Sequence, residues 1–230
     1  LVADHLRELG MEVRTGIAHT GVLGILKGGR PGPVIAVRAD MDALPVTEDT
    51  PLSFKSTVTT EYAGKTVGVM HACGHDIHTS VQMGVASMLA DVASELPGTI
   101  LFIFQPAEEG APAGEEGGAT LMLEEGVFDN PKPEAVFGLH ALPSLTVGTV
   151  GYTAGPAFAA VDHFAIKVRG QQAHGARPEE GIDPIVMASE IVLALQTIRS
   201  RTLSPLQPSV VTVGMFQGGI RSNIIPAEVH

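Results

Sequence analysis

The sequence lacks tryptophan altogether and contains a single cysteine, Cys73. One cysteine cannot close a disulfide within the chain, so nothing in the sequence calls for an oxidising compartment. Aromatic residues make up only 4% of the sequence, whereas hydrophobic residues make up 44%. Aliphatic side chains must therefore fill the core that this hydrophobic content supports.

Positive charge is also scarce, because 14 Lys and Arg stand against 25 Asp and Glu, for a formal net charge of −11. Such an acidic chain is a poor partner for the phosphates of nucleic acids and for anionic membrane surfaces. The sequence shows no apolar run long enough to span a bilayer and no signal peptide. We therefore expect a cytoplasmic protein with no nucleic-acid and no membrane partner.

Metal-ligand side chains crowd into one short stretch, Met70-His71-Ala72-Cys73-Gly74-His75-Asp76. Cysteine thiolates, imidazoles and carboxylates are the groups that bind zinc and its neighbours in the first transition row. Two further segments offer the same chemistry, the pair Glu108-Glu109 and the lone His140. Together these residues predict a metal-dependent hydrolase.

Three predicted strands end at such polar residues. The apolar runs are 33–38, 99–104 and 135–139, and they stop before Asp40 and Asp42, before Glu108 and Glu109, and before His140. Short, nearly continuous apolar runs are typical of parallel strands that are buried on both faces. In open α/β sheets, ligands bind beyond the carboxyl ends of the strands. The pattern therefore places a metal site at one edge of a parallel sheet.

Periodicity and turn residues predict the remaining elements. We expect helices at 76–95, 119–125 and 182–201, strands at 11–15, 21–27, 147–153, 161–168, 209–216 and 221–229, and an irregular loop at 47–65. After the break at Gly155-Pro156 the order strand, helix, strand, strand indicates a separate α+β layer. The expected fold is α/β: a mostly parallel-sheet catalytic domain over 1–156 and a second, smaller α+β domain over 157–230.

Each candidate residue also has a plainer interpretation. Cys73 could be an ordinary buried residue or a nucleophile, although a nucleophile needs a basic partner and an oxyanion site. The two glutamates could be a solvated pair, and His140 an ordinary hydrogen-bonded histidine. The surplus of carboxylates favours a metal site over cysteine chemistry.

Several polar residues near the candidate ligands are better suited to supporting them. Asp40 and Asp42 are expected to orient a ligating histidine, and His71 and His78 are expected to be structural or to play a similar supporting role. In the second half of the chain, His174 could be a surface loop histidine, and Asn223 could serve a glycine-containing turn.

The motifs, in their order along the chain, resemble the M20 metallopeptidase family. Its amidohydrolase branch, with hippurate hydrolases, N-acyl-amino-acid deacylases and indole-acetyl-amino-acid hydrolases, is the most similar. The motifs are Arg38-Ala39-Asp40-Met41-Asp42-Ala43-Leu44-Pro45, the 70–76 stretch, Gln105-Pro106-Ala107-Glu108-Glu109-Gly110, Gly138-Leu139-His140 and Ala173-His174-Gly175-Ala176-Arg177-Pro178. The resemblance implies that Cys73, His75, Glu109 and His140 bind two divalent ions, with Cys73 bridging them, and that Glu108 is the general base.

The resemblance also implies a role for the smaller domain, as a lid through which two subunits dimerise. His174 and Asn223 would help to hold the substrate or the oxyanion there, often across the dimer interface. A further histidine ligand is implied near the end of the catalytic domain. His230 does not match it, because the residues before it resemble a strand of the smaller domain. We therefore expect the catalytic domain to be incomplete here, lacking its start and its closing part.

The expected reaction is hydrolysis of the amide bond in small N-acyl amino acids, with zinc, manganese, cobalt or nickel as the metal. We expect a homodimer formed through the lid domain. Two alternatives remain open: a dipeptidase or carboxypeptidase of the same family, and a catalytically incompetent fragment that acts as a binding or dimerisation module.

Overall fold

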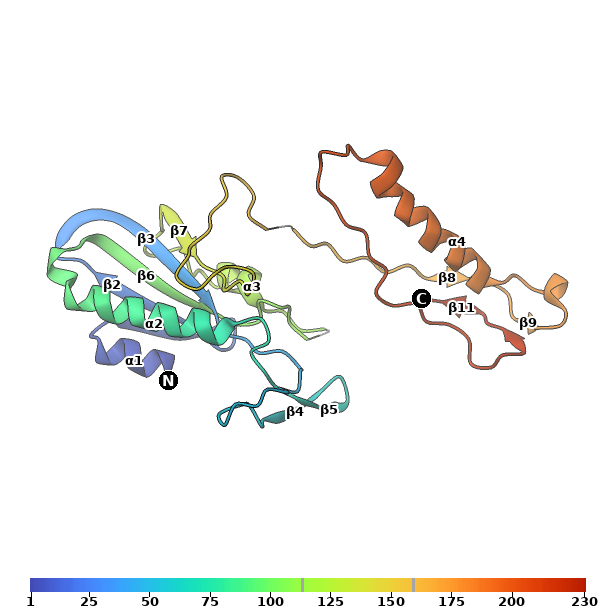
Figure 1. Cartoon of the computed structure of the whole chain (residues 1–230), viewed down its shortest axis with the longest axis horizontal. Coiled ribbons are helices and arrows are strands. Elements are labelled where there is room, and N and C mark those ends of the chain that lie inside the picture. The colour runs from blue at the N-terminus through green and yellow to red at the C-terminus, as the bar shows by residue number, and fades with distance from the viewer. Residues whose placement is uncertain (113, 159) are drawn as a thin grey trace. The chain divides into compact units, whose positions relative to one another are not determined.

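The computed structural model describes residues 1–112, 114–158 and 160–230. The chain forms two compact units, Leu1–Gly151 and Tyr152–His230. The first unit contains the main sheet and the second contains the long helix α4, Pro184–Thr197 (Figure 1). The assignment of residues 1–156 to a catalytic domain and of 157–230 to a smaller α+β domain stays a prediction.

A five-stranded sheet with the order β1-β2-β6-β3-β7 forms the centre of the first unit. Its strands are β1 Glu12–Ile17, β2 Gly21–Lys27, β3 Arg30–Asp40, β6 Pro97–Gln105 and β7 Ala135–Gly138. β2 runs antiparallel to both of its neighbours, whereas β3 runs parallel to β6 and to β7. Four strands therefore point in one direction, which confirms an α/β fold with a mostly parallel sheet.

Helices cover both faces of this sheet. They are α1 Val2–Glu8, α2 His75–Asp91 and α3 Gly118–Glu124. Phe102 and Phe104 of β6 are fully buried in the core beneath α1 and α2, which lie side by side in Figure 1. Leu101 and Ile103 of the same strand point the other way and pack with Met122 of α3. This alternation is the expected consequence of the two-residue period of a strand.

The strand order places the carboxyl ends of β3, β6 and β7 at a topological switch. The chain passes from β3 to β6 on one side, and then crosses to β7 on the other side of β3. The connection after β3 and the connection after β6 thus run in opposite directions along the sheet, and ligands bind at such a switch point in open α/β sheets. The register pairs Asp40 with Gln105 and Arg38 with Gly138, so the segments after these strands leave the sheet at the same edge.

Helix α2 begins one residue earlier than predicted and ends earlier, at Asp91, with a short 3-10 turn at Ala93–Glu95. Its N-cap is Gly74, which has a left-handed backbone with φ of 84°. Glycine adopts this conformation without strain. Cys73 therefore precedes the helix, and His75 is its first residue rather than part of the loop.

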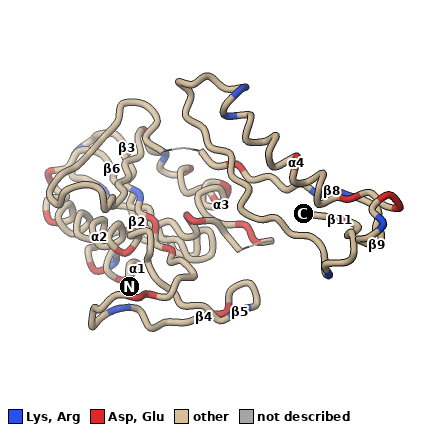
Figure 2. Tube along the Cα trace, turned by 45° about the vertical axis from the view of Figure 1, so that its right-hand side comes forward, with Lys and Arg blue, Asp and Glu red and all other residues tan. Residues whose placement is uncertain are grey.

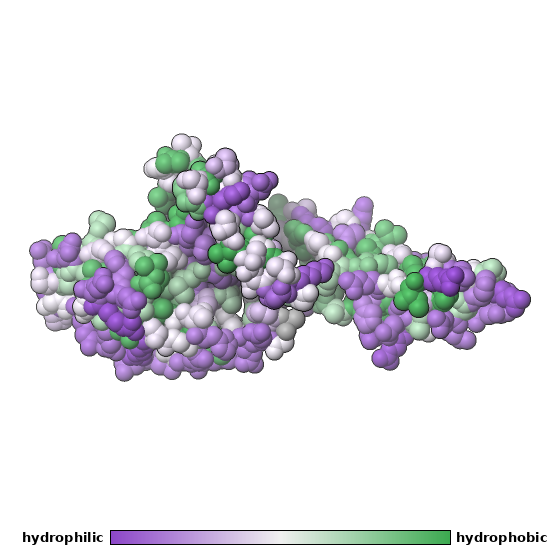
Figure 3. Space-filling model, turned by 90° about the horizontal axis from the view of Figure 1, so that it is seen from below, coloured by the Kyte–Doolittle hydropathy of each residue, from purple (hydrophilic) through white to green (hydrophobic). Residues whose placement is uncertain are grey.

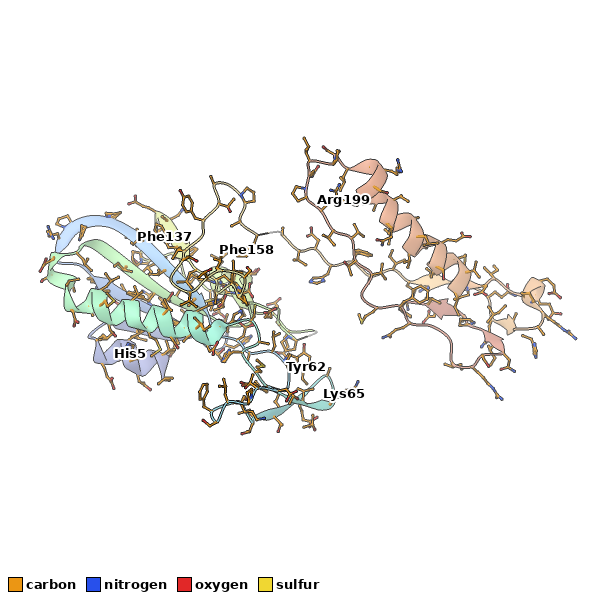
Figure 4. All side chains as sticks on the ribbon, viewed as in Figure 1. His5, Tyr62, Lys65, Phe137, Phe158 and Arg199 are labelled. Carbon is orange, nitrogen blue, oxygen red and sulfur yellow. The ribbon has the colours of Figure 1, made fainter. Side chains whose placement is uncertain are left out.

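The predicted irregular loop at 47–65 is wrong at its C-terminal end. It contains a hairpin of β4 Thr59–Tyr62 and β5 Lys65–Gly68. Tyr62 pairs with Lys65 across the turn (Figure 4), and Ala63 and Gly64 both have positive φ angles. Two such residues favour a two-residue hairpin turn, although the alanine gives only a weak signal in the sequence.

The part of the chain from residue 147 onward contains less strand than predicted. β8 Val168–Arg169 pairs with β11 Glu228–Val229, and β9 Ala173–His174 pairs with β10 Ile224–Ile225. The predicted strands at 147–153 and 209–216 are wrong, and only the last residue of the one at 161–168 is in a strand. Val150 and Val210 from these segments are 94% and 86% exposed. An alternating segment becomes a strand only where a neighbouring backbone completes the ladder.

Helix α4 starts two residues later than predicted, at Pro184, because Asp183 accepts hydrogen bonds from the amides of Ile185 and Val186 and so caps it.

Within the described residues, no helix combines the length and apolar character that crossing a membrane requires. Hydrophobic and hydrophilic residues are interspersed on the face of the molecule seen in Figure 3.

Candidate metal centre

Three groups of metal-ligand side chains meet at His75. They are Cys73, His75 and His140; His75, Glu108 and Glu109; and Asp40, His75 and His78. Within each group the ligand atoms lie within 4.8 Å of one another. The structure thus brings together the five residues of this unit that the sequence singled out, from the ends of β6 and β7 and the start of α2.

The imidazole of His75 is oriented by a carboxylate. Its Nδ1 lies 3.1 Å from Oδ1 of Asp42 and 3.0 Å from the backbone oxygen of the same residue. Both partners can only accept, so Nδ1 carries a proton, and in the neutral imidazole Nε2 carries the lone pair that a metal ion needs. The other oxygen of Asp42 accepts the backbone amide of Glu109 at 3.0 Å. Asp42 therefore ties the segments after β3 and β6 to the start of α2.

The lone pair of His75 Nε2 faces negative charge. The side chain is 1% exposed, and Nε2 has no hydrogen-bond partner. Carboxylate oxygens of Glu108, Glu109 and Asp40 lie 3.7, 3.9 and 3.8 Å away. Buried polar atoms are normally paired, and a lone pair gains nothing from carboxylates. A cation among these atoms would satisfy all of them, so the donor set fits a divalent metal ion.

Cys73 and His140 form the other side of the site. Cys73 Sγ lies 3.4 Å from Nε2 of His140, whose Nδ1 donates to the backbone oxygen of Ala141 at 2.9 Å. Burial, a hydrogen bond with Glu109 and the nearby charges of Glu108 and Asp40 raise the pKa of the Cys73 thiol to about 11. A cysteine nucleophile needs a lowered pKa, so this environment disfavours the nucleophile interpretation.

Asp40 lies 1% exposed behind the site. Burial alone would raise its pKa, but the hydrogen bond with His78 and the charge of Arg38 outweigh it and hold the pKa below its ordinary value. Arg38 donates to Asp40 Oδ2 at 2.7 Å and to the side-chain oxygen of Gln105 at 2.9 Å. Asp40 is therefore a fixed carboxylate at the end of β3.

The two glutamates follow a strained turn. Ala107 has φ of +49°, a region that residues other than glycine rarely adopt. Its backbone oxygen lies so close to Gly118 that a Cβ there would come within 2.8 Å of it. Strained residues of this kind gather at functional sites. Figure 2 shows the acidic residues on the loop that leads from this turn into α3.

His174 and Asn223 lie together in the second unit. His174 pairs with Ile224 between β9 and β10, and the backbone amide of Gly175 donates to the oxygen of Asn223 at 2.8 Å. Nδ1 of His174 accepts the backbone amide of Ala176 at 3.0 Å. Both residues are exposed. Their roles toward a substrate stay predictions.

Sequence reasoning missed part of the supporting network. Gln105 holds Arg38, and the Thr79 hydroxyl donates to the backbone oxygen of Asp40 at 3.0 Å. His71, which was expected to be structural or supporting, has its Nδ1 3.0 Å from the backbone oxygen of Asp42. A hydrogen bond from a side chain to a distant backbone oxygen cannot be predicted from the sequence. The proximity of His75 and His78 can be predicted, because residues three apart lie on the same side of a helix.

Known proteins are similar to this chain in sequence and in fold. A family model for peptidase family M20/M25/M40 matches residues 36–225. N-acetyl-L-cysteine deacetylase of Bacillus subtilis is 46% identical over 224 residues, which cover 97% of this chain and 50% of that protein. N-acyl-L-amino acid amidohydrolase of Geobacillus stearothermophilus is 42% identical over 211 residues, or 92% of this chain and 53% of that protein.

A solved structure agrees with these relatives. The YxeP protein of Bacillus subtilis, described as a dinuclear metal binding peptidase of family M20, matches 99% of this chain and 54% of its own, with 38% identity and a TM-score of 0.71. The chain spans about half the length of the relatives it matches. On the family match and these identities, the chain belongs to peptidase family M20/M25/M40, in its amidohydrolase branch.

Proposed function

We propose that the protein is a metal-dependent amidohydrolase that cleaves the amide bond of small N-acyl amino acids. The observation that carries the proposal is the buried, unpartnered Nε2 of His75 among three carboxylates, with Cys73 and His140 beside it. The names of the similar proteins from Bacillus and Geobacillus support this substrate class.

We assign Cys73, His75, Glu109 and His140 as the residues that would hold two divalent ions. Each offers a donor atom to one of the three groups around His75. The thiolate and imidazole donors suit zinc, and the carboxylate also accepts manganese, cobalt or nickel. When bound, such a metal pair polarises the amide carbonyl and lowers the pKa of a water molecule.

Glu108 is the proposed general base. Its carboxylate is 37% exposed, so it can reach both a water molecule and a substrate, and its Oε2 lies 3.7 Å from His75 Nε2. It would take a proton from the attacking water and pass it to the leaving amine. In the proposed homodimer, His174 and Asn223 of one subunit would stabilise the oxyanion that develops on the carbonyl oxygen at the metal site of the other. The second unit would act as a lid and join two subunits into a homodimer.

The function is tested on Glu108→Gln and Cys73→Ser variants of the protein. Glu108→Gln should abolish hydrolysis of N-acetyl amino acids and keep the bound metal, because glutamine keeps the shape but accepts no proton. Cys73→Ser should lower the metal content measured by mass spectrometry. A matched control is Glu116→Gln, an exposed residue of the following loop.

The outcomes separate the alternatives. Hydrolysis of free dipeptides but not of N-acyl substrates would favour a dipeptidase. Bound metal without any hydrolysis would favour a binding module. Loss of metal in Glu108→Gln would show that Glu108 is a ligand and not the base. Cell fractionation would test the proposed cytoplasmic location, which the single cysteine favours.

A further inference from the structure

His78 is a buried histidine to which the proposed chemistry gives no role. Its side chain is 0% exposed. Its Nδ1 is hydrogen bonded to Oδ1 of Asp40, and its Nε2 lies 2.7 Å from the backbone nitrogen of Ala141. A backbone N–H can only donate, so Nε2 carries the lone pair and Nδ1 carries the proton. Both nitrogen atoms are then used, and His78 has no lone pair left for a metal ion.

The two partners of His78 belong to opposite sides of the site. Asp40 ends β3, where Arg38 and the Thr79 hydroxyl hold it. Ala141 follows directly after His140, and its backbone oxygen accepts the Nδ1 proton of that histidine. The rings of His78 and His140 also meet edge to face, with centroids 4.6 Å apart. His78 therefore connects a fixed strand end to the backbone that orients His140.

Within the described residues, the strand before His140 and the residue next to it are partly exposed. Strand β7 has only β3 as a neighbour, and its Phe137, labelled in Figure 4, is 58% exposed. Leu139, next to His140, is 51% exposed. Where hydrophobic burial is weak, a buried hydrogen bond decides the position of the backbone.

We propose that His78 is a positioning residue: it accepts the Ala141 amide and thereby sets the approach of His140 Nε2 to Cys73 Sγ. The inference rests on the proposed metal site. In other metal sites, a carboxylate behind a histidine ligand fixes the orientation of the ring. His78 would orient His140 in the same sense, but through the backbone of Ala141, the residue after the ligand.

Three substitutions separate the two bonds of His78. Glutamine can place its amide oxygen near the position of Nε2 and so accept the Ala141 amide. Asparagine is shorter; it can donate to Asp40 but cannot reach Ala141. Leucine makes neither bond. The readouts are the affinity for Co²⁺, by titration into the chelator-treated protein, and the absorption band of cobalt bound to the Cys73 thiolate.

His78→Asn and His78→Leu should bind Co²⁺ about 10–100-fold more weakly than the wild type and show an altered thiolate band. His78→Gln should stay within about threefold, because it restores the acceptor. The matched control is Gln82→Leu, which removes a buried side chain one turn further along α2 that donates to Ile103. That variant should lose stability without a change in Co²⁺ affinity.

Wild-type affinity in His78→Asn, or affinity as weak in His78→Gln as in His78→Leu, would overturn the inference while leaving the metal site intact. If Gln82→Leu binds Co²⁺ as weakly as His78→Asn does, the loss of affinity reflects a general loss of stability, and the positioning role of His78 is overturned too. A wild-type protein that binds no Co²⁺ would refute the proposed function and this inference with it. If His78→Leu does not fold, the comparison of Asn with Gln decides.

Discussion

The substitution Glu109→Gln should change thermal stability in opposite directions with and without metal. In the metal-free protein the carboxylates of Glu108 and Glu109 and the lone pair of His75 all lie within 4.8 Å of one another. Two unit charges at that separation repel by about 0.9 kcal/mol at the dielectric constant of water. The two glutamate side chains are only 37% and 32% exposed, so the repulsion is at least of this size. Removing one charge should stabilise the metal-free protein by about 1 kcal/mol, or about 2–4 °C in melting temperature.

With metal present the sign reverses. At a metal concentration of about 100 times the dissociation constant, binding stabilises the wild type by about 2.7 kcal/mol. If losing the Glu109 ligand weakens binding about 100-fold, the same concentration stabilises the variant by only about 0.4 kcal/mol. The loss of about 2.3 kcal/mol exceeds the gain from reduced repulsion. The metal-loaded variant should therefore melt below the metal-loaded wild type.

Scanning calorimetry in chelator and in excess Mn²⁺ measures both differences. Glu115→Gln, an exposed glutamate further along the same loop, is the control, and it should change stability by less than about 0.5 kcal/mol in either condition. A Glu109→Gln variant that melts lower than the wild type in chelator would refute the repulsion argument. Equal metal-induced shifts in variant and wild type would refute the assignment of Glu109 as a ligand.

Two further predictions concern the loops around the site. Glu48 accepts hydrogen bonds from the Ser56 amide and the Thr50 hydroxyl, which hold its pKa below the ordinary value of 4.5. A lowered pKa in the folded protein gives stability that is fully present above the pKa of the unfolded chain. This stability is lost as the pH falls through the lower pKa of the folded protein, so the Ser56 amide should stay protected from exchange at the ordinary pKa and lose protection only at lower pH. Glu48→Gln should remove that pH dependence. Ala107→Val should lower the free energy of unfolding by about 1–3 kcal/mol and weaken metal binding, because a β-branched residue disfavours a positive φ angle. Ala107→Gly should leave stability unchanged or raise it. Thermal melts and metal titrations measure both variants, and equal behaviour of the two would contradict the prediction.

The first unit of the chain could largely be predicted, because its signals are local. The run at 99–104 is apolar without interruption, which identifies a strand buried on both faces, and the structure extends it by only a few residues, as β6. The strand at 21–27 matches β2 residue for residue. Polar residues that directly follow such strands must gather at one edge of a parallel sheet, so the neighbours of His75 could be anticipated without knowing the register.

The second half could not be predicted in the same way, because strands there depend on partners. Residues 209–216 are rich in strand-forming apolar residues, yet Met215 is 77% exposed and the segment joins no ladder within the described chain. Within the site, the tautomer of His78 depends on the backbone amide of Ala141, which is distant in the sequence. The start of α2 depends on the left-handed backbone of Gly74. Side-chain patterns do not record such contacts.

Strand β6 supplies alternate residues to two separate cores and also delivers the glutamate pair to the crevice. One residue inserted into or deleted from β6 would reverse every side chain beyond it, exchange Phe102 and Phe104 with Ile103 at the two faces, and shift Glu108 and Glu109 out of line with His75. Substitutions that conserve volume can accumulate in this strand, but changes of length cannot. Related proteins should therefore differ in length in the loops on either side of β6, and the distance from its centre to the glutamates should stay constant even where little of the sequence does.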